Sequence, residues 1–268
     1  MTQVRKTGTA WEVKLDDYAY THGLDRPGWA WEFLRRNKRF AMDCRISQAG
    51  APTPINHVSG ATYLRSRRRF PRAESWGLLL FPDPIKTVLE APVFWLPEVL
   101  GYHVRATSHP IRSDADEALA LEDFKCRRDV LAINGVEHVI VRHAQETAHL
   151  SLEGLSFLHG KRRCVFHIET LSKVSTVSET LQTLNKLRER AKLKDTNGCQ
   201  PDLKWRDYLV ALDGHLTGRS YRDIAEVLHG AERVKEVWTN ETRHLKDRVR
   251  RAVERGVELM KGDYRTLL

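Results

Sequence analysis

Apolar and polar residues alternate along the middle of the chain in the manner of short β-strands. The clearest case is a pair of largely apolar stretches, 129–133 and 136–141, separated by Asn-Gly at 134–135. Asn-Gly tolerates the positive backbone angles of a two-residue turn, so this pattern predicts a β-hairpin. Residues 148–152 and 164–168 predict further short strands. We therefore expect a small, mainly antiparallel sheet.

Two continuous apolar runs precede the hairpin, at residues 78–81 and 93–96, and both are bounded by prolines. Short apolar runs between turn signals are typical of buried strands, so we expect a strand at each. Nearer the start, Pro27 suits the first turn of a helix, and Trp29 and Phe33 lie on one side of it at helical spacing.

After the strands the hydrophobic period becomes helical. Ser178 is suited to cap a helix that carries an apolar stripe, and this helix should end before Asn197-Gly198 and Pro201. The stripe consists of Leu181, Leu184, Leu187 and Ala191. The Asn-Gly-Cys-Gln-Pro segment is our preferred domain boundary.

Every element beyond this boundary is expected to be helical. We predict helices at 203–216 and 220–229, then a short helical turn containing Val234, Val237 and Trp238, and a long helix from Thr239 to about Met260. The prediction is thus an α+β protein with a C-terminal all-helical, helix-turn-helix-like domain. We divide the chain into residues 1–110, a β-hairpin region with a connecting helix at 111–200, and the helical domain at 201–268.

The segment 220–230 carries the strongest functional pattern. Ser220 is expected to cap a short helix whose Ile224, Ala225 and Leu228 face inward, and Gly230 ends it. A small residue such as Ala225 permits the close helix crossing of a helix-turn-helix unit. The connection that follows is longer than the tight turn of the simplest motif, so we expect an intervening turn of helix anchored by Trp238.

The long helix after Trp238 has one apolar face and two basic flanks. Its arginines and lysine project beside the face that includes Leu245 and Val249. Placed in a major groove, such a helix brings its first polar residues to base edges and its later arginines to phosphates. The alternative is a solvated helix whose charges pair at i,i+4 spacing. The candidate DNA-binding residues are Asn240, Arg243, His244, Lys246, Arg248, Arg250, Arg251 and Arg255.

Charge and composition agree with a nucleic-acid partner but do not select it alone. The chain has 44 Lys and Arg against 35 Asp and Glu, a net charge of +9, which attracts nucleic acid or an anionic membrane. No apolar run is long enough to span a bilayer and no secretory signal is evident, so we expect a cytoplasmic protein that does not enter the membrane. The four cysteines lack metal-binding spacing and are expected to be reduced thiols.

Several segments resemble a known family. The stretches 220–225, 230–234, 245–251 and 262–268 are similar to a proteobacterial domain regarded as a helix-turn-helix variant. It occurs in activators and antiactivators of the transfer of integrative and conjugative elements. The front of the chain is similar to the transcriptional-regulator-like region that precedes this domain in full-length activators, on residues 29–37, 76–78, 83–84 and 93–95.

This resemblance, to the frameshifted excision activators of such elements, implies the function. The chain would activate the gene of an excision factor by binding promoter DNA as a double strand. It also implies two partners, a single-domain antiactivator relative and RNA polymerase. Whether the chain forms a homo-oligomer is left undecided by the resemblance. The rival from the same resemblance is a protein-interaction antiactivator module that sequesters a related regulator without binding DNA.

An enzyme is the competing class, because twelve histidines invite a search for metal or acid–base sites. None forms a helical metal-binding pair, and His138 is expected on the same strand face as Ile140 and Arg142. We find no phosphate loop, nucleophile elbow or paired carboxylates, and expect no catalytic residue, metal site or cofactor. Two further groups stay secondary. We expect the arginines at 65–72 to form a solvated loop, with a second DNA-contact patch as the alternative. We expect the aromatics at 29–33 to be core, with a partner-docking surface as the alternative.

Overall fold

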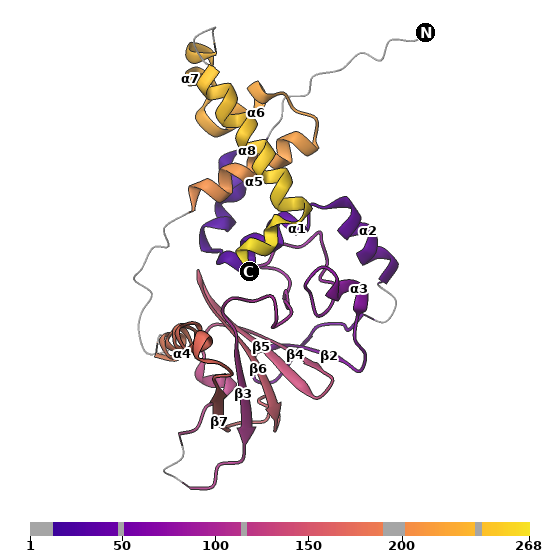
Figure 1. Ribbon diagram of the computed structural model, residues 1–268, viewed down its shortest axis with the longest axis vertical. Helices are drawn as coiled ribbons and strands as arrows, with labels where there is room; N and C mark the ends of the chain where they lie inside the picture. Colours follow the sequence, from indigo (N-terminus) through magenta and orange to yellow (C-terminus); the bar gives the residue numbers. More distant parts are fainter. Residues whose placement is uncertain (1–12, 48–50, 114–116, 190–201, 239–242) are drawn as a thin grey trace.

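The computed structural model describes residues 13–47, 51–113, 117–189, 202–238 and 243–268. It is elongated, with a β-sheet at one end and the C-terminal helices at the other (Figure 1). The N-terminal helices lie between these two ends. The preferred boundary at 197–201 lies outside the described residues, so the expected division into domains stays a prediction.

The N-terminal region begins with η1 (Leu15–Gly23) and continues through α1 (Arg26–Leu34) and α2 (Lys38–Ser47) to α3 (Pro71–Glu74). The Asp25 side chain caps α1 by accepting a hydrogen bond from the Gly28 amide at 2.8 Å, and Pro27 lies in its first turn as expected. Trp29, Trp31 and Phe33 of α1 are buried, which makes them core rather than an exposed partner surface.

The sheet has seven strands in the order β1-β2-β4-β5-β6-β3-β7. The strands are β1 (Ile55–Asn56), β2 (Thr62–Ser66), β3 (Val104–His109), β4 (Arg127–Ile133), β5 (Val136–His143), β6 (Glu146–Gly154) and β7 (Arg163–His167). Asn134 and Gly135, with φ of 52° and 80°, form the predicted turn between β4 and β5.

The sheet is mixed, so the expectation of a small, mainly antiparallel sheet is corrected. β2 pairs parallel with β4, and β3 pairs parallel with β6, while the other four pairings are antiparallel. Parallel neighbours are joined by long connections, and local turn signals carry no information about such pairings. The α+β class itself is confirmed.

The two apolar runs at 78–81 and 93–96 are not strands. They meet in one isolated bridge between Leu78 and Trp95, with the Leu79 amide donating to the Phe94 carbonyl at 2.9 Å. Prolines border both runs and lack the amide that a longer ladder requires. The runs contribute to the core as buried irregular chain.

The two faces of the sheet are covered differently. α4 (Val174–Glu189), preceded by η3 (Leu171–Lys173), packs Leu184 and Leu187 on one face, beside η2 (Leu121–Asp123). Since α4 begins at Val174, Ser178 is an exposed residue inside the helix and not its cap. On the opposite face Leu131, Ile133 and Ile140 belong to the core under the N-terminal helices.

A chain of hydrogen-bonded histidines lies on that second face. The Ser151 hydroxyl is 2.8 Å from His103 Nε2 and 2.9 Å from His138 Nδ1. His149, two residues along β6 from Ser151 and on the same face, is buried as well. Burial lowers the pKa of His103 to about 3 and the pKa values of His138 and His149 to about 4, because the charged imidazolium loses its hydration.

The C-terminal helices are α5 (Leu203–Leu216), α6 (Tyr221–His229), α7 (Ala231–Val237) and α8 (Arg243–Lys261), followed by η5 (Asp263–Leu267). They pack back onto α1, so both ends of the chain contribute to one hydrophobic core. The C-terminal members of this core are Leu209, Val210, Leu212, Leu259, Tyr264 and Leu267.

Candidate nucleic-acid interface

The helical unit α5–α8 is held together by a core of its own. Ile224 and Ala225 of α6, Val234 of α7 and Val249 of α8 are fully buried in it. Ala225 is the small residue that the helix-turn-helix pattern requires at a close crossing. The unit lies at the end of the molecule remote from the sheet (Figure 1).

The local signals that predicted α6 are present. The Ser220 hydroxyl accepts a hydrogen bond from the Asp223 amide at 3.2 Å, and the Asp223 carboxylate accepts from the Ser220 amide at 3.0 Å. This reciprocal capping box fixes the first turn. Gly230, at φ 87°, ends α6 and leads directly into α7.

The expected intervening helical turn is confirmed as α7. Val234 anchors it in the core, and Trp238, whose amide donates to the Val234 carbonyl at 2.8 Å, follows its last turn. Lys246 Nζ lies 5.3 Å from the centre of the Trp238 ring, which joins the end of α7 to the first turns of α8. The side chain of Val237 is outside the described set.

Close packing of α8 on α5 fixes its rotation. A Cβ at Gly256 would lie 2.7 Å from the Tyr208 carbonyl oxygen and 3.0 Å from Leu212 Cβ, so the two helices approach each other at this glycine. The apolar face of α8 is thereby directed at α5 and α6. Its two flanks are left at the surface on either side.

The first of these flanks, the Arg250 flank, carries mutually compensating charges. Arg250 lies 3.6 Å from Asp247 and 3.0 Å from Glu254, measured between guanidinium nitrogen and carboxylate oxygen. Lys246, on the same flank, stacks on Trp238. This flank matches the solvated, i,i+4-paired helix that the sequence left as the alternative reading.

The other flank, the Arg248 flank, consists of His244, Arg248, Arg251 and Arg255. At 3.6 residues per turn these positions fall within an arc of about 60°. Arg255 is paired with Glu258 at 2.9 Å and Asp263 at 2.6 Å. Among the described residues, Arg248 has no hydrogen bond or ion pair, and Arg251 donates only to the Asp247 backbone carbonyl, at 3.3 Å.

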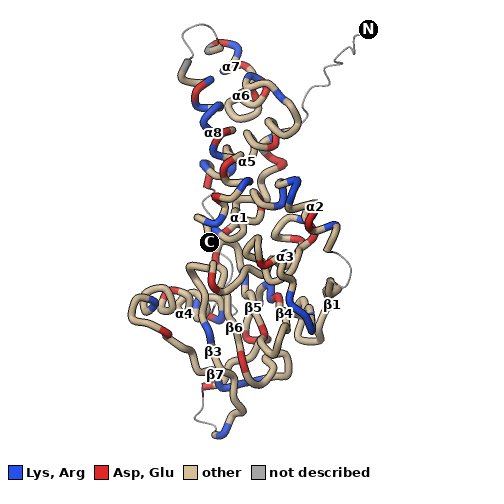
Figure 2. The backbone as a smooth tube through the Cα atoms, turned by 45° about the vertical axis from the view of Figure 1, so that its right-hand side comes forward, with Lys and Arg blue, Asp and Glu red and all other residues tan. Residues whose placement is uncertain are grey.

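His229 and Arg233 border the Arg248 flank from α6 and α7. The pKa of His229 is lowered, first by partial burial and then by the nearby charge of Arg248, with Arg233 adding to the effect and Asp207 opposing it. Positive charge from two helices therefore converges beside His229. In Figure 2, Lys and Arg alternate with Asp and Glu along α6–α8, and further Lys and Arg lie on the sheet.

The predicted DNA-contact residues are thus distributed over both flanks of α8. His244, Arg248 and Arg251 are exposed on one flank, and Lys246 and Arg250 are exposed on the other. Asn240 and the Arg243 side chain lie outside the described set, so their expected role at base edges stays a prediction. Sequence reasoning did not include His229 and Arg233 in the candidate interface. Their position within the predicted helix-turn-helix segment was the signal that could have identified them.

The arginines at 65–72 lie elsewhere, on β2 and the segment that follows it. Arg69 forms an ion pair with Glu74 at 2.7 Å, and Arg68 lies over the Phe70 ring. Part of this run is a strand rather than the loop expected, because β2 is paired with β4. Within the described ranges, no three His, Cys, Asp or Glu side chains gather closely enough to hold a metal ion.

No described helix combines the length and apolar character needed to cross a lipid bilayer.

The unit is capped, has a small residue at its crossing, and carries a basic flank on which Arg248 and Arg251 have no carboxylate partner among the described residues. This is the arrangement of a helix-turn-helix type nucleic-acid-binding module. Comparison with known families agrees with this class. Residues 169–268 match the family described as T6SS, Transcription factor, DNA binding domain. Residues 14–82 match the proteobacterial transcriptional regulator-like domain. The two matches support a DNA-binding transcriptional regulator, and no curated protein matches the chain.

Proposed function

We propose that this protein is a transcriptional activator that binds promoter DNA through α6–α8, with the Arg248 flank toward the duplex. The observation that carries the proposal is the contrast between the flanks of α8. Arg250 is neutralised by two carboxylates, whereas Arg248 has no carboxylate partner among the described residues. A phosphate can then pair with Arg248 without first displacing an internal partner.

Further aspects of the proposal rest on the family resemblance seen in the sequence. We infer that the target is the gene of an excision factor of an integrative and conjugative element, that the protein acts in the cytoplasm, and that it has no catalytic activity. Its partners would be RNA polymerase and a single-domain antiactivator related to the C-terminal helices. The presence of both a regulator-like and a DNA-binding region favours an activator over an antiactivator.

The test is DNA affinity measured by fluorescence anisotropy against salt concentration, with duplexes from the region upstream of the excision gene. Arg248→Ala and Arg251→Ala should each weaken binding. Each should lower the magnitude of the slope of log affinity against log salt by about 0.9 for a lost phosphate contact. Arg250→Ala is the matched control on the same helix and should change the slope less.

A rival DNA surface is tested in the same titration. If Arg69→Ala reduces the slope while Arg248→Ala and Arg251→Ala leave it unchanged, the arginines at 65–72 bind DNA and the proposal is wrong. If no duplex is retained but a single-domain relative is bound, the protein is the interaction module that formed the runner-up.

A further inference from the structure

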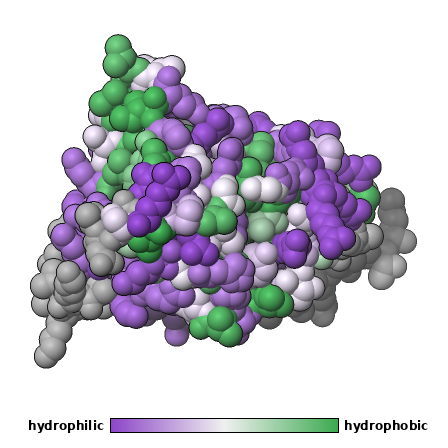
Figure 3. Space-filling view, turned by 90° about the horizontal axis from the view of Figure 1, so that it is seen from below, coloured by the Kyte–Doolittle hydropathy of each residue, from purple (hydrophilic) through white to green (hydrophobic). Residues whose placement is uncertain are grey.

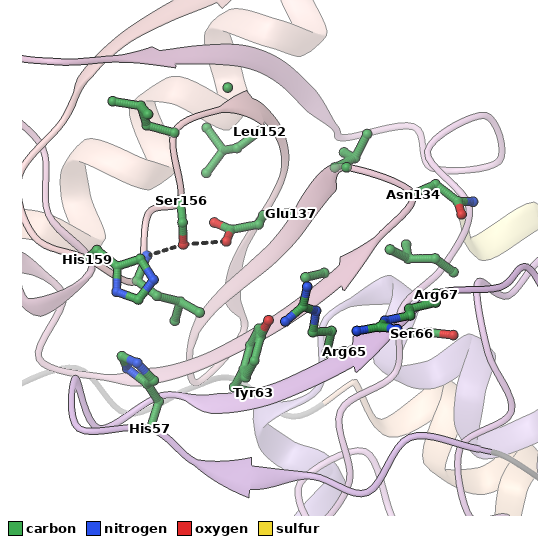
Figure 4. A pocket seen from close by; sticks show the side chains of 17 residues that line it. His57, Tyr63, Arg65, Ser66, Arg67, Asn134, Glu137, Leu152, Ser156 and His159 are labelled. Carbon is green, nitrogen blue, oxygen red and sulfur yellow. Dashed lines mark hydrogen bonds between the residues drawn. The ribbon is translucent and has the colours of Figure 1, made fainter.

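A cavity of about 650 Å³ opens at the edge of the sheet (Figure 4). The strands that border it lie far from the α6–α8 unit (Figure 1). The cavity is bounded by β2, the β4–β5 hairpin and the segment that follows β6. This volume lies within the usual range for small-molecule sites. Viewed from the sheet end, the molecular surface is largely hydrophilic, with apolar atoms gathered mainly at one corner (Figure 3).

The strand register explains why the cavity exists. Arg65 on β2, Ala132 on β4, Glu137 on β5 and Leu152 on β6 are direct neighbours across the sheet. Residues in one such row point to the same face. Because Ala132 is small, it leaves space between the long side chains of Arg65 and Glu137.

Each oxygen of the carboxylate in this wall already accepts a hydrogen bond. Glu137 Oε1 accepts a hydrogen bond from the Ser156 hydroxyl at 2.5 Å, and Oε2 accepts from the Phe157 amide at 2.8 Å. Ser156 in turn accepts from the Leu158 amide at 3.2 Å. Glu137 therefore holds the 156–158 segment in place and is not the counter-ion of the arginines nearby, as Figure 4 shows.

The cations of the cavity are left without such partners. Neither the Arg65 nor the Arg67 guanidinium forms a hydrogen bond or ion pair with a described residue, and both are exposed. Arg65, near the end of β2, and Arg67, in the bend that follows the strand, both line the cavity. Two guanidinium groups in one cavity can bind one anionic group together.

Planar side chains form the adjoining wall. The rings of His57 and His159 are 6.1 Å apart, and Tyr63 lies 6.3 Å from His57. His57 Nδ1 accepts a hydrogen bond from the Ser59 amide at 3.2 Å, so in the neutral ring the proton is on Nε2. His57 therefore offers an N–H donor beside the rings of Tyr63 and His159, both of which are inclined at 66° to its own ring.

We propose that this cavity binds a small organic anion in which a planar ring carries a carboxylate or phosphate group. Arg65 and Arg67 bind the anionic group, and the ring lies against the wall formed by His57, Tyr63 and His159. The proposal does not depend on the DNA-binding function, since it concerns a different end of the molecule and is measured without DNA.

The test is isothermal titration calorimetry of the full chain with two probes, salicylate for the carboxylate and AMP for the phosphate. Salicyl alcohol and adenosine are the uncharged counterparts. We expect saturable binding of at least one anion, and at least tenfold weaker binding of its uncharged counterpart. The probe that binds shows which anionic group the site accepts.

Variants locate the site. Arg65→Ala and Arg67→Ala should each raise the Kd about tenfold. Ala132→Leu fills the space between the Arg65 and Glu137 side chains without removing a charge, and it should also weaken binding. Arg72→Ala is the matched control, because Arg72 is exposed on α3 and does not line the cavity. Circular dichroism of each variant shows that the fold is retained.

Three results overturn the proposal. One is the absence of saturable binding of both anions at millimolar concentration. A second is binding that Arg65→Ala, Arg67→Ala and Ala132→Leu leave unchanged. The third is a DNA duplex that binds instead of either probe and is lost with the same arginines, which would make the cavity rim a nucleic-acid contact.

Discussion

Arg36 and Asp213 form a two-pronged ion pair that joins the end of α1 to α5. Arg36 Nε donates to Asp213 Oδ1 at 2.5 Å, and a second guanidinium nitrogen donates to Oδ2 at 2.9 Å. The pair is mostly buried, and Glu32 and Tyr18 bind to it through further hydrogen bonds. The regulator-like and DNA-binding regions are thus connected by a shielded polar contact as well as by the apolar core.

The first prediction concerns this contact. Asp213→Ala should lower the free energy of unfolding by about 3 kcal/mol, because it removes one of the two carboxylates that bind the buried Arg36 guanidinium and also removes the acceptor of the Tyr18 hydroxyl. Urea denaturation followed by circular dichroism measures this change. Asp247→Ala, which breaks an exposed pair, should cost less than about 1 kcal/mol. Equal changes in the free energy of unfolding would show that the Arg36–Asp213 pair stabilises the fold no more than an exposed ion pair does.

A second prediction uses the close approach of α8 and α5. Gly256→Ala should destabilise the protein by about 1–3 kcal/mol, because the new methyl group would meet the Tyr208 carbonyl at 2.7 Å. Intrinsic helix propensity alone would favour alanine by about 1 kcal/mol. Gly262→Ala is the control, since a Cβ there meets nothing within 4 Å. A more stable Gly256→Ala variant would contradict this packing.

Acid should weaken the fold through the buried histidines. The pKa values of His103, His138 and His149 are lowered in the folded protein from about 6.5 to about 3, 4 and 4. At pH values between these lowered pKa values and about 6.5, the unfolded chain therefore binds more protons than the folded protein. The contribution of these histidines to stability is present above about pH 6.5 and is lost as the pH falls toward 4. The slope is up to about 1.4 kcal/mol per pH unit for each histidine.

Unfolding midpoints measured between pH 7.5 and 5 test this dependence. His138→Gln keeps a polar side chain near Ser151 and removes one titrating group, so its stability should fall less steeply with acidification. A pH profile identical to that of the unmodified protein would exclude His138 as a contributor.

The surroundings of His229 can be tested without DNA. Because the charge of Arg248 contributes to lowering the pKa of His229, Arg248→Ala should raise that pKa toward the ordinary value. Titration of the His229 ring signals by NMR measures the shift. Arg250→Ala, on the opposite flank, should leave the titration unchanged. A His229 pKa insensitive to Arg248 would place that side chain away from α6.

Limited proteolysis tests the domain boundary expected at 197–201. We expect cleavage between residues 195 and 201, with α5–α8 protected. The fragments should then remain together in size-exclusion chromatography, since Leu209 and Leu259 share a core with Trp29 and Phe33. Rapid cleavage within 220–260, or prompt separation of the fragments, would contradict this expectation.

Sequence reasoning succeeded where a short segment determines its own structure. The Asn134–Gly135 turn and the Ser220 cap both follow from hydrogen bonds and backbone angles within a few residues. It failed where distant segments decide the outcome. The strand β3 and the parallel pairing of β2 were not expected, because their partners β6 and β4 lie far along the chain.

The basic residues of the candidate site could be named from the sequence, but the pairing of their charges could not. Spacing along α8 identified two basic flanks, yet the flanks differ only through the pairing of their charges. Asp247 and Glu254 both turn toward Arg250, and Arg248 instead lies near His229 of another helix. That assignment depends on how α8 is rotated against α5, and tertiary packing sets the rotation.

The core shared by α1, α8 and η5 has a consequence for biosynthesis. Trp29, Trp31 and Phe33 are synthesised well before Leu259, Tyr264 and Leu267, with which they share this core. Chains are synthesised at about 5–20 residues per second, so the N-terminal aromatic cluster stays uncovered for roughly ten seconds or more. This core can form only after residues 259–267 have emerged from the ribosome. Until then the nascent chain exposes hydrophobic surface of the kind that chaperones bind.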